Sequence, residues 1–160
     1  MRTIEKTVFK FSELSEAAKD NARSWFVGLG EFNWADENQG SIETFCDHFG
    51  VALLKSCVGP HEAITFETDA ENKHFRGRKL RDFKRDHMPT GYCRDCDIWQ
   101  TFYDEFKHTG DAKHAFEVAL WAGFKGWRAD MEDQLSDEYI DGQLIVNEYE
   151  FTEDGEFFRG

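Results

Sequence analysis

The sequence predicts an α+β fold in which a small, mostly antiparallel sheet packs against several helices. Short segments with alternating apolar residues are typical of strands, and apolar residues at helical spacing recur between them. Aromatic residues make up 16% of the chain, which favours a packed core because disordered chains are poor in aromatics. A length of 160 residues without a linker-like segment predicts one domain over residues 1–160.

The first elements are a strand and an amphipathic helix. Residues 7–11 (TVFKF) alternate and are rich in β-formers, which predicts a strand. Ser12 or Ser15 can cap the helix that follows, and Gly28 and Gly30 end it. The apolar positions that define its inner face are Leu14, Ala18, Ala22, Trp25 and Leu29.

The next stretch predicts a polar loop over residues 31–40 and a short helix over 41–50. Residues 51–58 and 63–68 are two expected strands, and the turn between them contains Gly59. Residues 73–77 are a candidate third strand. Residues 78–88 predict a basic helix that turns Leu80, Phe83 and either His87 or Met88 inward and that Pro89 ends.

The second half of the chain is mainly helical in pattern. Helices are expected over residues 97–110 and 111–135, and a shorter one follows Ser136 as its cap. Gly123 and Gly126 weaken the second of these helices, which suggests close packing against a neighbour. The tail returns to strand-like alternation, with Tyr149 and Phe151 on one face, Glu148 and Glu150 on the other, and a turn at Asp154–Gly155.

The charge is strongly negative and unevenly distributed. The formal net charge is −13, which excludes a nucleic-acid binder with a uniformly basic surface and argues against direct nucleic-acid binding. Residues 73–95 hold eight basic and three acidic residues, whereas residues 130–160 hold eleven acidic residues and one basic residue. Such a chain fits a protein without a charged partner, a binder of basic surfaces, or a mimic of nucleic acid. Alternatively, the basic segment neutralises the acidic tail within the molecule.

The acidic residues near the C-terminus are the candidate partner-binding surface. Duplex DNA carries a charge about every 1.7 Å of its axis, so dense carboxylates held on helices and a strand can occupy a basic channel. The default alternative is a solvated surface that only keeps the protein soluble. The candidates are Asp130, Glu132, Asp133, Asp137, Glu138, Glu148, Glu150, Glu153 and Asp154.

The basic segment is the one place in the chain that could contact phosphate. Its candidate contact residues are Arg78, Arg81, Lys84 and Arg85. They are interleaved with Phe75 and Phe83, as basic residues are on stacking platforms for nucleic acid. The alternative, which we favour from sequence, is a helix with a charged outer face and two core aromatics.

The four cysteines offer a weak zinc motif. Cys93 and Cys96 form a single CxxC, and either Cys46 and Cys57 or the histidines His48, His61 and His87 could complete a tetrahedral set. A second CxxC is missing, so reduced thiols without a metal or other cofactor are the main expectation.

No catalytic motif is visible. The chain has neither a Gly-x-Ser-x-Gly elbow nor a glycine loop that cradles phosphate, so we do not expect an enzyme. It also has no apolar stretch long enough for a membrane span or for the core of a secretory signal, which predicts a cytoplasmic protein with no membrane partner.

Both ends of the chain carry a family likeness. "TVFKFSELSEAAKDNARSWF" and "DEYIDGQLIVNEYEFTEDGEFF" resemble the two ends of small acidic proteins encoded by phages and plasmids, some of which are labelled antitoxins of toxin–antitoxin systems. The central "FGVALLKSCVGPHEAITFET" resembles the helix–strand–strand part of the same group, whereas "GYCRDC" and the basic segment depart from it.

This resemblance implies a protein of a mobile element that acts inside a bacterial cell. The function it suggests is binding and inhibition of a bacterial nucleic-acid-handling defence complex, of the anti-CRISPR or anti-restriction type, with nucleic-acid mimicry as one form. The partner would be a protein or ribonucleoprotein with a basic surface. The alternatives are an antitoxin-like protein that neutralises a basic toxin, and a zinc-binding structural or enzymatic domain.

Overall fold

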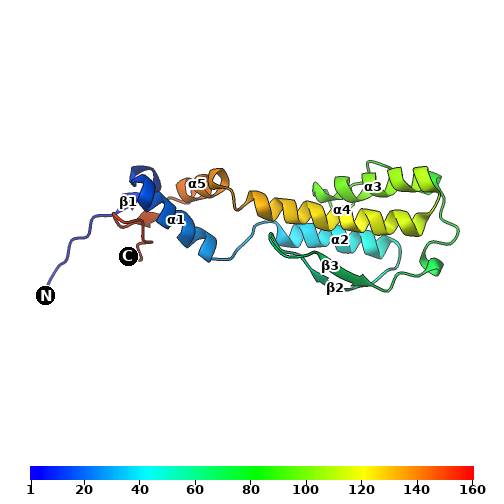
Figure 1. The fold of residues 1–160 in the computed structure, drawn as a ribbon, viewed down its shortest axis with the longest axis horizontal. Helices are drawn as coiled ribbons and strands as arrows, with labels where there is room; N and C mark the ends of the chain where they lie inside the picture. Colours follow the sequence, from blue (N-terminus) through cyan, green and yellow to red (C-terminus); the bar gives the residue numbers. More distant parts are fainter. The chain divides into compact units, whose positions relative to one another are not determined.

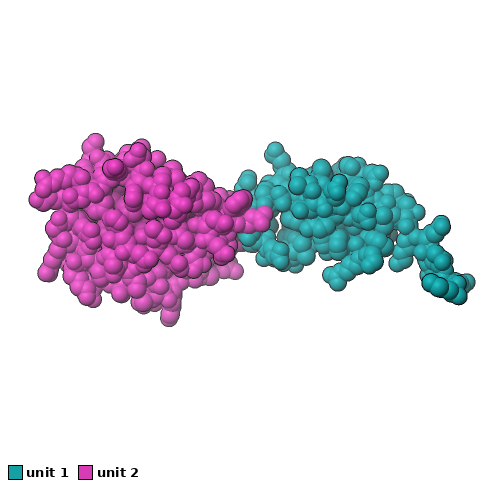
Figure 2. Space-filling model, turned by 180° about the vertical axis from the view of Figure 1, so that it is seen from behind, with its two compact units in different colours: residues 1–32, 132–160 teal, residues 33–131 magenta.

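The computed structural model describes residues 1–160 and combines five α-helices with two separate two-stranded antiparallel sheets (Figure 1). The α+β class expected from the sequence is confirmed, with the strands divided between two sheets. The chain forms two compact units, which Figure 2 colours separately: unit 1 comprises residues 1–32 and 132–160, and unit 2 comprises residues 33–131. One domain over residues 1–160 stays a prediction, and each unit is described by itself.

Unit 1 is built from the two ends of the chain. Strand β1 (Phe9–Lys10) pairs antiparallel with β4 (Glu150–Phe151), with Phe9 opposite Phe151. Helices α1 (Glu16–Gly28) and α5 (Asp137–Val146) belong to the same unit. Each helix starts at a serine predicted from the sequence, because Ser15 Oγ accepts the amide of Ala18 at 3.2 Å and Ser136 Oγ accepts that of Tyr139 at 3.3 Å.

The core of unit 1 joins these elements through apolar side chains from both ends of the chain. Its buried members are Phe11, Leu14, Ala18, Ala22, Ile140, Leu144 and Phe151. Trp25 packs on their edge and stacks on Phe157 with ring centroids 4.2 Å apart. The tail therefore turns back after β4, as the sequence predicts, and the amide of Phe158 donates to the Glu150 carbonyl at 2.9 Å.

Unit 2 packs three helices beside a β-ribbon. Helix α2 spans Ala35–His48, α3 spans Arg94–Thr109, and α4 spans Ala112–Asp133. Strands β2 (Leu53–Cys57) and β3 (Thr65–Thr68) form the hairpin expected from the sequence, and Phe66 stacks on Phe124 of α4 at 5.0 Å.

Close approach of the three helices depends on Gly123 in α4. A Cβ at this position would lie 2.9 Å from Ile98 of α3 and 3.3 Å from Ile42 of α2. The close packing suggested for this glycine is therefore confirmed. Around it lies a core rich in aromatic rings, in which Phe45 stacks on Phe116 at 5.0 Å.

The stretch between β3 and α3 differs from the prediction. The candidate strand over 73–77 and the basic helix over 78–88 are absent; the chain instead forms two 3-10 turns, Asn72–His74 and Leu80–Asp82, within irregular structure. Only Phe75 and Phe83 of this stretch are buried, and two apolar anchors eight positions apart do not make the continuous stripe that a helix needs.

The polar loop expected over residues 31–40 is also wrong, because α2 already begins at Ala35. Its first turns carry Asn38 and Ser41, which are fully buried although polar. Hydrophobic periodicity could not place these turns in a helix, since the side chains that face inward are satisfied by hydrogen bonds and not by apolar contact.

Candidate functional site

Eight of the nine candidate carboxylates belong to unit 1. Glu132 and Asp133 end α4, Asp137 and Glu138 lie in the first turn of α5, and Glu148, Glu150, Glu153 and Asp154 lie along and after β4. All except the half-buried Glu150 are exposed. Unit 1 as a whole holds fifteen acidic and six basic residues, so its net charge is far more negative per residue than that of unit 2.

Internal ion pairs use part of this charge. Arg23 of α1 binds Asp141 of α5 through Nε and Nη2 at 2.7 and 2.8 Å, and its Nη1 binds Asp20 at 2.7 Å. The hydrogen bond to Asp141 is the main reason that the pKa of Arg23 is raised. Lys10 lies 3.7 Å from Glu150. In contrast, Asp137, Glu138, Glu153 and Asp154 make no ion pair.

A groove lies between α1 and α5, and Asp137 is the one of these four carboxylates that lines it. Its volume is about 510 Å³. Val27, Leu135 and Ile140 provide apolar walls, and the charged side chains of Asp20, Arg23 and Asp137 also line it. Arg23 already pairs with Asp20, so Asp137 supplies the unpaired charge at the edge. An apolar groove with such an edge has the chemistry to accept an apolar side chain next to a basic residue.

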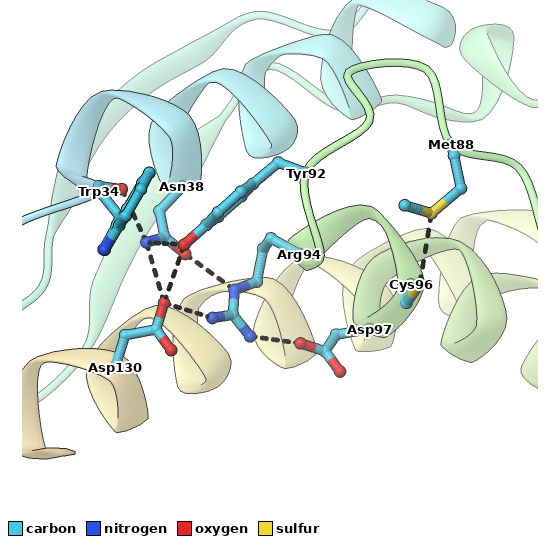
Figure 3. Close-up of polar contacts among 8 residues, drawn as sticks. All are labelled: Trp34, Asn38, Met88, Tyr92, Arg94, Cys96, Asp97 and Asp130. Carbon is cyan, nitrogen blue, oxygen red and sulfur yellow. Dashed lines mark hydrogen bonds and ion pairs between the residues drawn. The ribbon is translucent and has the colours of Figure 1, made fainter.

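The ninth candidate, Asp130, lies in unit 2 and has internal partners (Figure 3). Its Oδ2 is 2.8 Å from Nη2 of Arg94, and it accepts hydrogen bonds from Tyr92 Oη and Asn38 Nδ2, each at 3.2 Å. Arg94 also donates through Nε to Asn38 Oδ1 at 2.8 Å and pairs with Asp97. Asp130 is therefore a member of a structural network in unit 2.

The same network explains an unusual backbone conformation at Trp34. This residue precedes α2 with φ 68°, in the left-handed region that a bulky residue rarely adopts. Its carbonyl accepts the side-chain amide of Asn38 at 2.8 Å and the backbone amide of Asn38 at 3.0 Å. The Trp34 ring is exposed and lies parallel to that of Tyr92, with centroids 6.4 Å apart (Figure 3). Burial and the nearby Asp130 raise the pKa of Tyr92.

The four basic candidates do not share one helical face, because the segment is irregular. Arg85 pairs with Asp104 of α3 at 2.9 Å, and the Arg78 guanidinium lies 5.4 Å from the centre of the Phe49 ring. Arg81 and Lys84 are exposed and make no ion pair. Of the segment's remaining bases, Lys73 pairs with Glu71, and Arg94 belongs to the network described above.

The four cysteines are not brought together. Cys46 is buried, and this burial raises the pKa of its thiol to about 12. Cys57 lies 3.3 Å from the Glu62 carboxylate, Cys96 lies 3.3 Å from the sulfur of Met88, and Cys93 is exposed at the start of α3. No three His, Cys, Asp or Glu side chains are grouped so that they could hold a metal ion. The four-cysteine zinc site considered from the sequence is therefore not formed.

Sequence reasoning missed the Arg94 network and the α1–α5 groove. The only local signal of the network was that the polar residues 36–41 stand directly before the apolar helical pattern of α2. The groove had no local signal, because its walls come from positions more than a hundred residues apart.

No family model matches the chain, and no curated protein or solved structure is significantly similar to it. None of its helices is both long enough and apolar enough to span a membrane.

Proposed function

We propose that this protein acts by binding and not by catalysis, and that unit 1 binds a basic surface of a bacterial nucleic-acid-handling complex. The observation that carries the proposal is the excess of exposed carboxylates in unit 1, among them Asp137, Glu138, Glu153 and Asp154 without an ion pair, together with an apolar-walled groove that Asp137 lines. The expected partner surface combines Lys or Arg side chains with at least one apolar side chain.

The carboxylates and the apolar groove would contribute to binding in different ways. Carboxylates without internal partners attract a basic surface over several ångströms and accelerate association, and this contribution falls as salt screens it. The apolar walls of the groove would slow dissociation, because buried apolar area is not screened by salt. Strong salt dependence of the association rate is therefore expected.

The proposed target class is a defence complex, of the anti-CRISPR or anti-restriction type. It is supported by the likeness of both chain ends to acidic phage and plasmid proteins, and by the basic channels that such complexes use for nucleic acid. Carboxylates on α5 and after β4 would take the place of phosphates there. A basic toxin is the alternative partner, since the same surface chemistry would suit it.

The test compares two variants that change the net charge equally. One replaces Glu138, Glu148, Glu153 and Asp154 of unit 1 by Lys, and the matched control replaces Glu43, Asp47, Glu67 and Glu117, exposed acids of unit 2, by Lys. Bacteria with a restriction or CRISPR defence are infected with a targeted phage while expressing each form. We expect the wild type and the control variant to restore plaque formation by the phage, and we expect the unit 1 variant not to restore it.

Two outcomes would contradict the proposal. Equal loss in both variants would mean that overall charge matters and not unit 1. Failure of the wild type to protect phage against either type of defence, together with rescue of growth from a co-expressed basic toxin, would transfer the function to the alternative. Circular dichroism of both variants controls for folding.

A further inference from the structure

A pocket in unit 2 lies where the irregular basic segment meets the start of α4. Its volume is about 290 Å³. Phe75 and Phe106, each 7% exposed, form its apolar walls, and the connection from α3 to α4 closes one side. This volume is at the lower end of small-molecule sites, which span roughly 300–1,000 Å³.

Three basic side chains line this pocket: Arg76 and Arg78 from the segment, and Lys113 from the first turn of α4. None of them makes an ion pair, although the chain has 32 acidic residues. The Arg78 guanidinium lies over the aromatic face of Phe49, 5.4 Å from its centre. Its charge also acts on its surroundings, since burial first and Arg78 second lower the pKa of His48.

The pocket contains one opposing charge. Asp111 lines it, and the Oδ1 atom of Asp111 accepts the backbone amide of His114 at 3.0 Å. The single negative charge of Asp111, which already accepts a hydrogen bond at the start of α4, does not neutralise the three basic side chains of the pocket. Among the other bases of the segment, Lys73 and Arg85 each pair with a neighbouring carboxylate, whereas Arg81 and Lys84 are also unpaired but lie outside the pocket.

We infer that this pocket binds the phosphate group of a small phosphorylated ligand, held by Arg76, Arg78 and Lys113. Guanidinium groups bind phosphate oxygens in pairs, and an ammonium adds a compact third charge. Amide groups at the start of α4 add positive partial charge at the same end. The inference does not rest on the function proposed for unit 1, because the two sites share no residue.

The ligand is assigned as small because of the charge of the whole chain. A net charge of −13 repels a long polyanion beyond the pocket, whereas a mononucleotide or free phosphate presents its charge only within it. Both sources offer the same chemistry, a phosphate dianion. The measurement must therefore compare inorganic phosphate, a mononucleotide and a short oligonucleotide.

The test is calorimetric titration of the full chain with inorganic phosphate, AMP and a 5′-phosphorylated oligonucleotide at low and physiological salt. Wild type is expected to bind phosphate and AMP. Arg76→Gln and Lys113→Gln should each weaken binding about tenfold or more, since a hydrogen bond to a charged group is worth about 1.5–3 kcal/mol. Arg81→Gln and Lys84→Gln are matched controls, which remove the same charge outside the pocket and should change affinity less than about twofold.

Each other outcome overturns part or all of the inference. Absence of binding to phosphate and AMP at millimolar concentration would remove the site. Equal weakening by the Arg81 or Lys84 variants would replace the pocket by diffuse attraction. Tighter binding of the oligonucleotide than of AMP would overturn the small-ligand assignment. Unchanged thermal unfolding of each variant ensures that a loss of binding is not a loss of fold.

Discussion

At the scale of single residues, Arg94 illustrates how a charged side chain becomes part of a core. Its side chain is 6% exposed and is compensated by Asp97, Asp130 and Asn38. Taking a guanidinium out of water is costly unless its donors are satisfied. Removal of Arg94 leaves the buried Asn38 and the one-third-exposed Asp130 without their partner, whereas Asp97 is half exposed. The network is thus most sensitive to change at Arg94 and Asn38.

We therefore expect Arg94→Gln to lower the free energy of unfolding by about 3 kcal/mol. Urea denaturation followed by circular dichroism measures this. Arg85→Gln is the matched control, because its pair with Asp104 is solvent-exposed on both sides and its loss should leave the urea midpoint unchanged. If both substitutions lowered the free energy of unfolding equally, burial of the arginine would not determine how much stability its ion pairs contribute.

His48 provides a residue-scale prediction about pH. His48 is exposed overall, but its ring packs edge-on against Trp99 at 5.0 Å, and this partial burial, then Arg78 and His87, lower its pKa below the ordinary 6.5. The unfolded chain therefore binds a proton at this site before the native state does. Stability due to neutral His48 is present above about pH 6.5 and is lost as pH falls through the native pKa.

His48→Gln should accordingly reduce the loss of stability between pH 7.5 and pH 5.5. Unfolding free energies at the two pH values, measured by urea titration, give the difference for each protein. His108→Gln in α3 serves as the control, because His108 makes no ring contact with the aromatic core, and it should retain the wild-type dependence. If His48→Gln lost as much unfolding free energy between pH 7.5 and pH 5.5 as wild type, His48 would not be the source of the pH dependence.

At the scale of elements, the C-terminal turn depends on Gly155. Its φ of 82° disfavours any side chain, and a Cβ there would overlap the backbone carbonyl of Ala18 in α1. The turn after β4 is thereby pressed directly against α1, and Asn21 of that helix donates to the Asp154 carbonyl at 2.9 Å. A glycine at this place is required by both backbone conformation and contact.

Gly155→Ala is expected to destabilise unit 1 by at least about 2 kcal/mol, from strain and from displacement of the turn. Gly142→Ala in α5 is the contrasting substitution, since nothing lies within 4 Å of its Cβ position. It should raise stability by about 0.5–1 kcal/mol through helix propensity. Thermal unfolding of the two variants should therefore shift in opposite directions.

At the scale of the whole molecule, the two units differ in how the chain builds them. Unit 2 is one continuous segment with its own aromatic core, whereas unit 1 needs both ends of the chain to bury Phe11, Ala22, Leu144 and Phe151. Four of the five tryptophans belong to unit 2, and Trp25 alone reports on unit 1.

A segment of residues 33–133 is consequently expected to fold by itself. Near-ultraviolet circular dichroism should retain the signal of the buried Trp99, and the protein should unfold cooperatively in urea. The reciprocal fragments, residues 1–32 and 134–160, should each lack structure when alone, because neither holds a complete core. A segment 33–133 without near-ultraviolet signal would show that unit 2 depends on the rest of the chain.

The sequence by itself determined the features that rest on local pattern. It predicted the α+β class, the caps Ser15 and Ser136, the hairpin of β2 and β3, the long helix α4 and the return of the tail. Caps and turns act over three or four residues, and apolar periodicity is visible within one element, so no distant partner needs to be known.

Only the tertiary structure decided the burial of Asn38, the role of Asp130, the irregular course of the basic segment and the pocket with three unpaired cations. Arg94 and its partner Asn38 are separated by 56 positions, and no pattern near either one encodes the other. Whether a polar group is a ligand contact, a core member or a solvated charge depends on which groups share its surroundings, and those come together only on folding.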